Sequence, residues 1–297
     1  MPSVKDFEKG MKRPTWCPGC GNYAMWRALK QALERLGLDF HEFAVVWGIG
    51  CHGNGADFLR CQGFHALHGR SLPVATGIAL TNPDLKVIVE AGDGDGYGLG
   101  LGHFVHSTRR NVDMTLIAHN NQIYGLTTGQ VSPTSDHLMK TVSTPSGVLE
   151  WPVNPTGLAI AQEATFVARG FAGDIEQLTD LYVAAIEHPG FAVVDVFQPC
   201  VTWNKLNTFE WFRERVYKLE EKEGYDPTDR EAAFAESLST FHDLVCTPDE
   251  CRVPTGVFLR IEGEETYQEG LEQLDGPMWR KAEAPRDVTA VMDEYLT

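Results

Sequence analysis

EAGDGDGYGLGLGHFVHSTRRNVDMTLIAHNN, residues 90–121, contains two polar motifs that each follow an apolar run. Gly92-Asp93-Gly94 ends the run of residues 85–92, and Asn120-Asn121 ends the run of residues 114–121. Short apolar runs of this kind are typical of buried parallel strands. Residues 95–119 are long enough for a helix and a returning strand. We therefore expect both motifs at the carboxyl ends of neighbouring parallel strands, where open α/β sheets bind ligands.

Similar segments lie on both sides of this stretch. Residues 43–47 and 191–197 are apolar runs that predict buried strands, and residues 22–38 and 175–188 have the apolar spacing of helices. Strands that alternate with helices predict the α/β class with a doubly wound, mostly parallel sheet. The alternation weakens from about residue 202. We therefore expect a first domain over residues 1–202 and a C-terminal helical or irregular extension over residues 203–297, packed on the core or on a partner subunit.

The composition excludes several classes of function. The net charge is −16 at pH 7, which argues against nucleic acid as a partner because phosphate binding needs clustered Lys and Arg. We expect no membrane span, because no apolar run approaches the roughly 20 residues that one requires. The first residues, MPSVKDFEKGMKRPTW, contain no apolar signal region, so a cytoplasmic location is expected.

The two polar motifs carry oxygen ligands suited to a cation. Asp93 offers a carboxylate, Asn121 an amide oxygen, and Ile123 a backbone carbonyl just beyond. Mg²⁺ prefers such ligands and usually shares them with phosphates and water. The glycines around Asp93 allow close approach of backbone N–H groups to an anion. The sequence therefore predicts a Mg²⁺ ion that bridges a diphosphate to the protein.

The cysteines predict a second centre. WCPGCGN contains Cys17 and Cys20 in a CxxC pair, which suits zinc, a redox dithiol or an iron–sulfur cluster. Cys51 and Cys200 each follow a predicted buried strand, so both could converge on the same edge of the sheet. Cys61, on a predicted loop, could substitute for either of them. Cys246 and Cys251 lie in the extension and are expected to take no part, and no disulfide is expected in a reducing compartment.

GIGCHG, residues 48–53, matches the dinucleotide-binding pattern G-x-G-x-x-G. That pattern also requires an acidic residue that holds a ribose about 20 residues later. No Asp or Glu occurs between Phe58 and Pro83, so a nicotinamide site is not expected.

WCPGCGN, GIGCHG, HALHGRSLPVATGIALTNPDL, GDGDGYGLGLGH and NNQIYGLTTGQVSPTS, taken in this order, closely resemble the β subunit of 2-oxoacid:ferredoxin oxidoreductases. The resemblance covers roughly residues 12–205. It implies thiamine diphosphate (ThDP), Mg²⁺ and one [4Fe–4S] cluster as cofactors. The implied cluster ligands are Cys17, Cys20, Cys51 and Cys200, and the implied metal ligands are Asp93, Asn121 and Ile123. The residues implied around ThDP are Ile49, Gly50, Cys51, His52, His68, Gly94, Asp95, Gly125 and Leu126.

Two residues depart from the pattern of the family. His52 stands where many relatives have a small polar residue, and Thr128 stands where some relatives have lysine. Both are candidate catalytic residues, because either change could tune the choice of substrate.

The resemblance also implies a reaction and partners. The expected reaction is CoA-dependent oxidative decarboxylation of a 2-oxoacid to an acyl-CoA and CO₂, with electrons passing through the cluster to ferredoxin. We favour 2-oxoglutarate as the substrate, with pyruvate or a broad range of 2-oxoacids as the alternative. The expected partner is an α subunit that carries the pyrimidine-binding domain and the catalytic glutamate, in an (αβ)₂ heterotetramer. Two other functions stay open: a non-redox ThDP decarboxylase or lyase, and a zinc- or cluster-binding electron carrier without ThDP.

Overall fold

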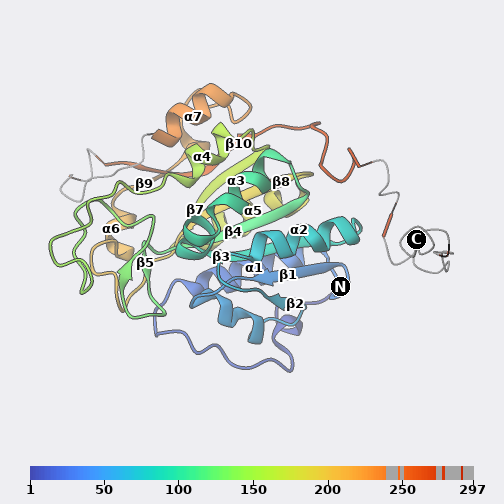
Figure 1. Ribbon diagram of the computed structural model, residues 1–297, viewed down its shortest axis with the longest axis horizontal. Coiled ribbons are helices and arrows are strands. Elements are labelled where there is room, and N and C mark those ends of the chain that lie inside the picture. Colours follow the sequence, from blue (N-terminus) through green and yellow to red (C-terminus); the bar gives the residue numbers. More distant parts are fainter. Residues whose placement is uncertain (239–246, 248–250, 272–275, 278–288, 290–297) are drawn as a thin grey trace.

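The structure, a computed structural model, describes residues 1–238, 247, 251–271, 276–277 and 289 (Figure 1). These residues form an eight-stranded sheet in the order β2-β1-β3-β4-β8-β7-β10-β9, and a small hairpin of β5 and β6 beside it. Neighbouring strands of the large sheet are parallel except β7 and β10. The strands are β1 (Phe43–Trp47), β2 (Gln62–His65), β3 (Lys86–Gly92), β4 (Met114–Asn120), β5 (Ile123–Tyr124), β6 (Gln130–Val131), β7 (Phe166–Phe171), β8 (Phe191–Phe197), β9 (Val216–Lys218) and β10 (Val253–Arg260).

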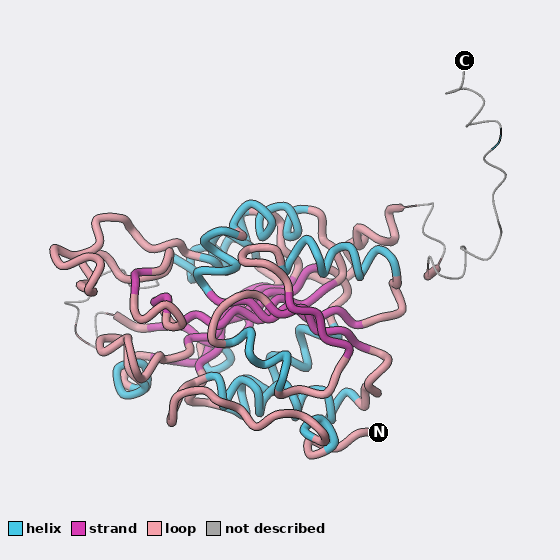
Figure 2. The backbone as a smooth tube through the Cα atoms, turned by 60° about the horizontal axis from the view of Figure 1, so that its bottom comes forward, coloured by secondary structure: helices cyan, strands magenta, loops and turns pink. Residues whose placement is uncertain are grey.

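Helices cover both faces of the sheet, and Figure 2 shows the strands between two helical layers. Alternate residues of one strand face opposite layers: Val45 belongs to a core cluster that includes residues of α1 and α5, whereas Val46 belongs to a cluster that includes residues of α2, α3 and α4. The doubly wound α/β fold predicted from the sequence is thus confirmed. The helices are α1 (Asn22–Leu36), α2 (Ser71–Thr81), α3 (Leu101–Arg109), α4 (Pro155–Ala161), α5 (Ile175–Glu187), α6 (Phe209–Arg213) and α7 (Arg230–Leu238), with short helical turns η1 (Asp6–Glu8), η2 (His52–Asp57), η3 (Gly94–Leu99) and η4 (Leu219–Glu221).

The predicted helix after Cys20 is α1, and its end follows from one glycine. Gly37 adopts φ 68° and donates its N–H to the carbonyls of Leu33 and Glu34. This left-handed conformation is accessible to glycine at little cost, so the residue ends the helix. The chain then turns into β1, whose carboxyl end leads into the GIGCHG segment.

Six of the described strands were not predicted from the sequence: β2, β5, β6, β7, β9 and β10. The segment of β7 contains Arg169, and a charged residue is not expected in a buried strand. In the structure its guanidinium forms an ion pair with Asp195 of β8, and both side chains are almost fully buried. The segment of β10 contains Pro254 and Gly256, which resemble a turn. Gly256 adopts φ 115° and lies against the carboxylate of Glu220, so a β-carbon there would come within 2.6 Å of it.

The chain beyond residue 202 contributes α6, β9, α7 and β10, so part of it belongs to the main sheet. Cys251 is disulfide-bonded, which corrects the expectation that no cysteine forms a disulfide. Cys246 lies outside the described residues. In the described part of the chain, no helix has the length and apolar character needed to cross a membrane.

Candidate active site at the carboxyl edge of the sheet

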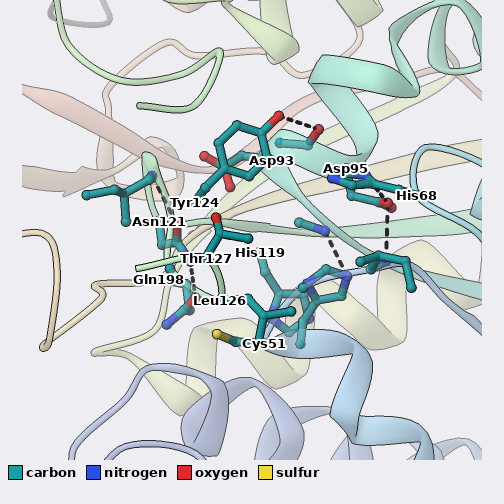
Figure 3. Close-up of a pocket in the computed structure, with 17 residues that line it drawn as sticks. Cys51, His68, Asp93, Asp95, His119, Asn121, Tyr124, Leu126, Thr127 and Gln198 are labelled. Atoms are coloured by element: carbon teal, nitrogen blue, oxygen red, sulfur yellow. Dashed lines mark hydrogen bonds and ion pairs between the residues drawn. The ribbon is translucent and has the colours of Figure 1, made fainter. Parts of the chain in front are cut away.

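The strands β1, β3, β4 and β8 are consecutive neighbours, so their carboxyl ends deliver four motifs to one edge of the sheet. A cavity lies there (Figure 3). Every residue predicted for ThDP or for the metal lines it: Ile49, Gly50, Cys51, His52, His68, Asp93, Gly94, Asp95, Asn121, Ile123, Gly125 and Leu126. Lining residues from Ile49 to Gln198 are therefore brought together by the topology of the sheet.

Asp93 lies at the carboxyl end of β3 and is buried. Its Oδ2 accepts hydrogen bonds from Ser132 Oγ at 2.6 Å and Thr134 Oγ1 at 2.7 Å. Burial raises the pKa of this carboxyl to about 6, although the two hydroxyl groups favour the charged form. A bound cation would favour the charged form further. The two hydroxyl groups thus fix the position of the carboxylate, and neither of these hydrogen-bond donors carries a positive charge.

Asn121 and Tyr124 complete this side of the cavity. Asn121 Oδ1 accepts a hydrogen bond from the backbone N–H of Ile123 at 3.0 Å, and its Nδ2 donates to Gln198 Oε1 at 3.3 Å. Tyr124 donates its hydroxyl to the carbonyl of Gly94 at 3.1 Å. Tyr124 thus joins the segment after β4 to the segment after β3, and Asn121 joins it to Gln198 after β8 (Figure 3). The arrangement can present several oxygen atoms to one small cation.

Asp95 joins three segments of the cavity wall. Its Oδ1 accepts hydrogen bonds from the backbone N–H of Ile49 at 3.2 Å and of Gly69 at 2.7 Å, and lies 3.0 Å from His68 Nδ1. A β-carbon at Gly48 would lie 2.0 Å from Asp95 Oδ2, so this approach requires glycine. Asp95 therefore fixes the GIGCHG loop and the His68 turn to the start of η3.

His52 is buried at the base of the cavity, with its ring centroid 5.1 Å from that of His119. The backbone N–H of Gly92 donates to His52 Nε2 at 3.0 Å. Burial lowers the pKa of His52 to about 3, so the ring is neutral and its proton lies on Nδ1. His52 is therefore a hydrogen-bond donor rather than a cation at neutral pH.

His119 links the cavity to the core behind it. Its Nδ1 lies 2.9 Å from Asn22 Oδ1, and its Nε2 is hydrogen-bonded to the carboxyl of Glu90. Burial lowers the pKa of His119 to about 3 and raises that of Glu90 well above its usual value. Both directions favour a neutral pair in which Glu90 carries the proton and donates it to Nε2. Such a pair avoids the cost of two buried charges.

A second cavity adjoins the first and is lined by all four cysteines predicted to hold the cluster, Cys17, Cys20, Cys51 and Cys200. The two cavities share Cys51, Asn121, Gly125, Leu126 and Gln198, which form the wall between them. Burial raises the pKa of Cys20 to about 12, with smaller contributions from the other three thiols. Cys61 lies elsewhere: its Sγ contacts the carbonyl of Leu59 at 3.6 Å, and its side chain packs against the apolar core.

Three observations test whether this cavity suits a multi-atom group. A β-carbon at Gly125 would lie 3.4 Å from Cys200 Sγ and 3.8 Å from Cys51 Sγ, so the backbone there leaves both thiols uncovered. Asn22 Nδ2, which belongs to a residue lining the cavity, is buried and has no hydrogen-bond partner in the described structure. Within the same described residues, no group of three or more His, Cys, Asp or Glu side chains is placed as the ligands of a metal ion. The uncovered thiols and the unpartnered amide are compatible with a group bound in this cavity.

The structure also adds lining residues that the sequence analysis did not predict: Gly92, His119, Tyr124, Thr127 and Gln198. Two of them could have been predicted from their positions in the sequence, because His119 directly precedes the asparagine pair and Gln198 stands two residues before Cys200. Thr128 is exposed on a turn with φ 78°, and Thr127 beside it lines the cavity instead.

Known proteins match this chain along most of its length. Residues 48–196 match the family described as "Thiamine pyrophosphate enzyme, C-terminal TPP binding domain", and residues 200–276 match the C-terminal family of the pyruvate ferredoxin oxidoreductase β subunit. The 2-oxoacid:ferredoxin oxidoreductase subunit beta of Saccharolobus solfataricus is 44% identical over 269 residues, which cover 88% of each chain. The 2-oxoglutarate oxidoreductase subunit KorB of Mycobacterium tuberculosis is 42% identical over 220 residues, which cover 72% of this chain and 58% of that protein.

A solved structure is similar over almost the whole chain. It is 2-oxoglutarate:ferredoxin oxidoreductase from Magnetococcus marinus with 2-oxoglutarate, coenzyme A and succinyl-CoA bound. Its TM-score is 0.86 at 35% sequence identity, and the match covers 99% of this chain and 96% of that chain. The family predicted from the sequence motifs is thereby confirmed. The chain belongs to the 2-oxoacid:ferredoxin oxidoreductases as a β subunit, with a thiamine diphosphate-binding domain over residues 48–196.

Proposed function

We propose that this β subunit acts in the CoA-dependent oxidative decarboxylation of 2-oxoglutarate, with ThDP, Mg²⁺ and a [4Fe–4S] cluster as cofactors. The observation that carries the proposal is the pair of adjoining cavities at the carboxyl edge of the sheet. One is lined by the predicted diphosphate and metal residues, and the other by four cysteines. A shared wall between a ThDP site and a cluster site is what a redox enzyme requires, because electrons must leave the first site through the second.

The metal and diphosphate would be held by the residues that follow β3 and β4. Asp93 would supply the carboxylate, Asn121 the amide oxygen and Ile123 its carbonyl, which together suit Mg²⁺. When bound, ThDP supplies the electron sink that decarboxylation of a 2-oxoacid needs. The neutral His52 would donate a hydrogen bond from Nδ1 to a polar group in the cavity, and Asp95 keeps the surrounding loops in place. Thr128 stays a candidate at the turn beside Thr127.

Cys17, Cys20, Cys51 and Cys200 would ligate the cluster. Thiolates are the ligands that iron–sulfur clusters use. The position of the four thiols beside the predicted ThDP site favours a cluster over a zinc ion, because a cluster can accept electrons whereas zinc has no redox chemistry. The adjoining ThDP-binding domain argues against an electron carrier without ThDP.

The partner would be an α subunit that brings the pyrimidine-binding domain and the catalytic glutamate. Exposed leucines lie at or beside lining segments of the first cavity: Leu126 lines it and is 54% exposed, and Leu67, which precedes His68, is 78% exposed. Leu99, at the end of η3, is 60% exposed and lies against Gly69. Apolar side chains gathered near a site are typical of a surface that a partner covers. An (αβ)₂ heterotetramer with ferredoxin as the electron acceptor completes the proposal.

The choice of substrate is tested by a panel of 2-oxoacids. The complex of this chain with its partner subunit is purified anaerobically, and CoA-dependent reduction of ferredoxin or a viologen dye is measured. We expect kcat/KM for 2-oxoglutarate to exceed that for pyruvate by at least about tenfold, or about 1.4 kcal/mol, because its second carboxylate can form charge-assisted hydrogen bonds. Equal or faster turnover of pyruvate would reject 2-oxoglutarate. Decarboxylation that needs neither CoA nor an electron acceptor would favour a non-redox enzyme.

The requirement for a partner is tested with this chain alone. After reconstitution of the cluster and addition of ThDP and Mg²⁺, we expect 2-oxoacid-dependent dye reduction to stay at background. The described carboxylates that line the site, Asp93 and Asp95, already accept hydrogen bonds from hydroxyl groups and a backbone N–H, so neither is expected to replace the glutamate of the partner. Addition of the partner subunit should restore turnover. Full turnover by the isolated chain would mean that the catalytic glutamate lies within these residues.

A further inference from the structure

Gln198 occupies the wall between the two cavities and lines both of them. Its side chain is 1% exposed. Nε2 donates to Cys20 Sγ at 3.4 Å and to the carbonyl of Pro199 at 3.3 Å, while Oε1 accepts a hydrogen bond from Asn121 Nδ2 at 3.3 Å. One amide group thus contacts a predicted cluster ligand on one side and a predicted metal ligand on the other.

The position of Gln198 is tightly fixed. Its backbone N–H donates to the carbonyl of Asn120 at 2.9 Å, which continues the pairing of β8 with β4. A β-carbon at Gly21 would lie 2.8 Å from Gln198 Cγ and 3.0 Å from Nε2, so the side chain packs directly on the start of α1. These contacts restrict the side-chain conformation of Gln198, so its amide keeps the same hydrogen-bond partners.

A second buried amide lies in the same region. Asn22 lines the cysteine cavity, and its backbone N–H is hydrogen-bonded to Cys20. Its Oδ1 contacts His119 Nδ1 of the first cavity, whereas its Nδ2 lacks a partner in the described part of the protein. N–H donors beside cluster ligands stabilise the added negative charge of a reduced cluster.

We propose that Gln198 is a positioning residue that sets the reduction potential of the cluster and orients Asn121 toward the metal. The inference rests on the proposed function. The N–H group stabilises negative charge on the Cys20 thiolate, and this charge is larger in the reduced cluster. Hydrogen bonds to cluster sulfur atoms are an established means of tuning these potentials. The carbonyl of the same amide holds Nδ2 of Asn121, so that Asn121 turns its oxygen away from Gln198.

Two substitutions separate the two contacts. Gln198→Met removes all three side-chain hydrogen bonds and keeps the approximate volume, whereas Gln198→Glu removes the donor to Cys20 and Pro199 and keeps an acceptor for Asn121. Gln177→Met is the matched control, because Gln177 is a buried glutamine on α5 whose amide bonds Glu220 instead. Each full-length variant is produced anaerobically with the partner subunit. Iron and sulfide content, the cluster potential from an EPR-monitored redox titration, and the Kd of ThDP with Mg²⁺ are measured.

We expect all variants to retain iron and sulfide. Both Gln198 variants should have a lower potential, with the equilibrium constant for reduction falling about tenfold, or about 59 mV for one electron. Gln198→Met should also weaken ThDP binding, whereas Gln198→Glu should bind ThDP within about twofold of the wild type. Gln177→Met should change neither quantity.

Three results would overturn the inference, and they differ from one another. An unchanged potential in both Gln198 variants with full cluster content would reject the tuning role. Loss of the cluster from both variants, with the control intact, would mean that Gln198 retains the cluster rather than tunes it. Wild-type complex without iron and sulfide would reject the proposed cluster itself, and the inference with it.

Discussion

Asp93→Ala is expected to abolish Mg²⁺-dependent binding of ThDP. Asp93 is the charged member of the predicted metal ligands, and the amide of Asn121 and the carbonyl of Ile123 cannot neutralise a cation paired with a diphosphate. We expect affinity to fall by more than about 100-fold, or about 2.8 kcal/mol. The measurement is the ThDP retained after gel filtration in the presence of Mg²⁺, supported by calorimetric titration of the purified complex.

Asp113→Ala serves as the control for this variant. Asp113 directly precedes β4, at the opposite edge of the sheet, where its carboxylate accepts a hydrogen bond from the backbone N–H of Gly190 at 3.3 Å. ThDP binding should survive that change. Iron content should be unaffected in both variants, because neither side chain lines the cysteine cavity. ThDP bound to Asp93→Ala at wild-type stoichiometry would show that the metal site lies elsewhere.

Cys200→Ser is expected to lose the cluster or to hold it weakly, whereas Cys61→Ser should keep it. Cys200 lines the cavity with Cys17, Cys20 and Cys51, and serine is a poor replacement for a thiolate that binds iron. Cys61 packs against the apolar core, and burial raises its pKa to about 12. The measurements are iron, acid-labile sulfide and the dithionite-bleachable absorption near ~400 nm that is typical of such clusters.

The opposite pattern, with the cluster lost from Cys61→Ser and kept in Cys200→Ser, would move the fourth ligand to Cys61. It would also contradict the argument that β1 and β8 deliver their cysteines to one edge. Zinc in place of iron and sulfide in the wild-type protein would favour the non-redox alternative.

Much of the site could be predicted because it depends on local rules. A buried parallel strand reads as an apolar run, and its carboxyl end lies at the ligand-binding edge whatever the rest of the fold. This is why Asp93 and Asn121 could be assigned to one site from the sequence alone. The position of Cys51 and Cys200 at the same edge follows from the same rule, since both come after strands, β1 and β8, that run parallel in one sheet.

The unpredicted parts depend on contacts between distant residues. Arg169 looks unsuited to a buried strand until Asp195 is seen beside it. Thr127, rather than Thr128, lines the cavity because the turn after β5 takes a left-handed conformation at Thr128, which no periodicity reveals. The roles of His119 and Gln198 depend on partners 97 and 178 positions away in the sequence.

The antiparallel strand β10 has a consequence for how the chain can be divided. β10 pairs along β7 from Phe166 to Arg169, and without it β7 would be the last strand on its side of the large sheet. An open edge of unpaired backbone groups is a template for intermolecular pairing and aggregation. Loss of β10 would also expose apolar surface that Phe258 and Leu259 now cover, since both are fully buried. We therefore expect a fragment of residues 1–202 to aggregate when it is produced without β10, although every predicted cofactor ligand lies within that fragment.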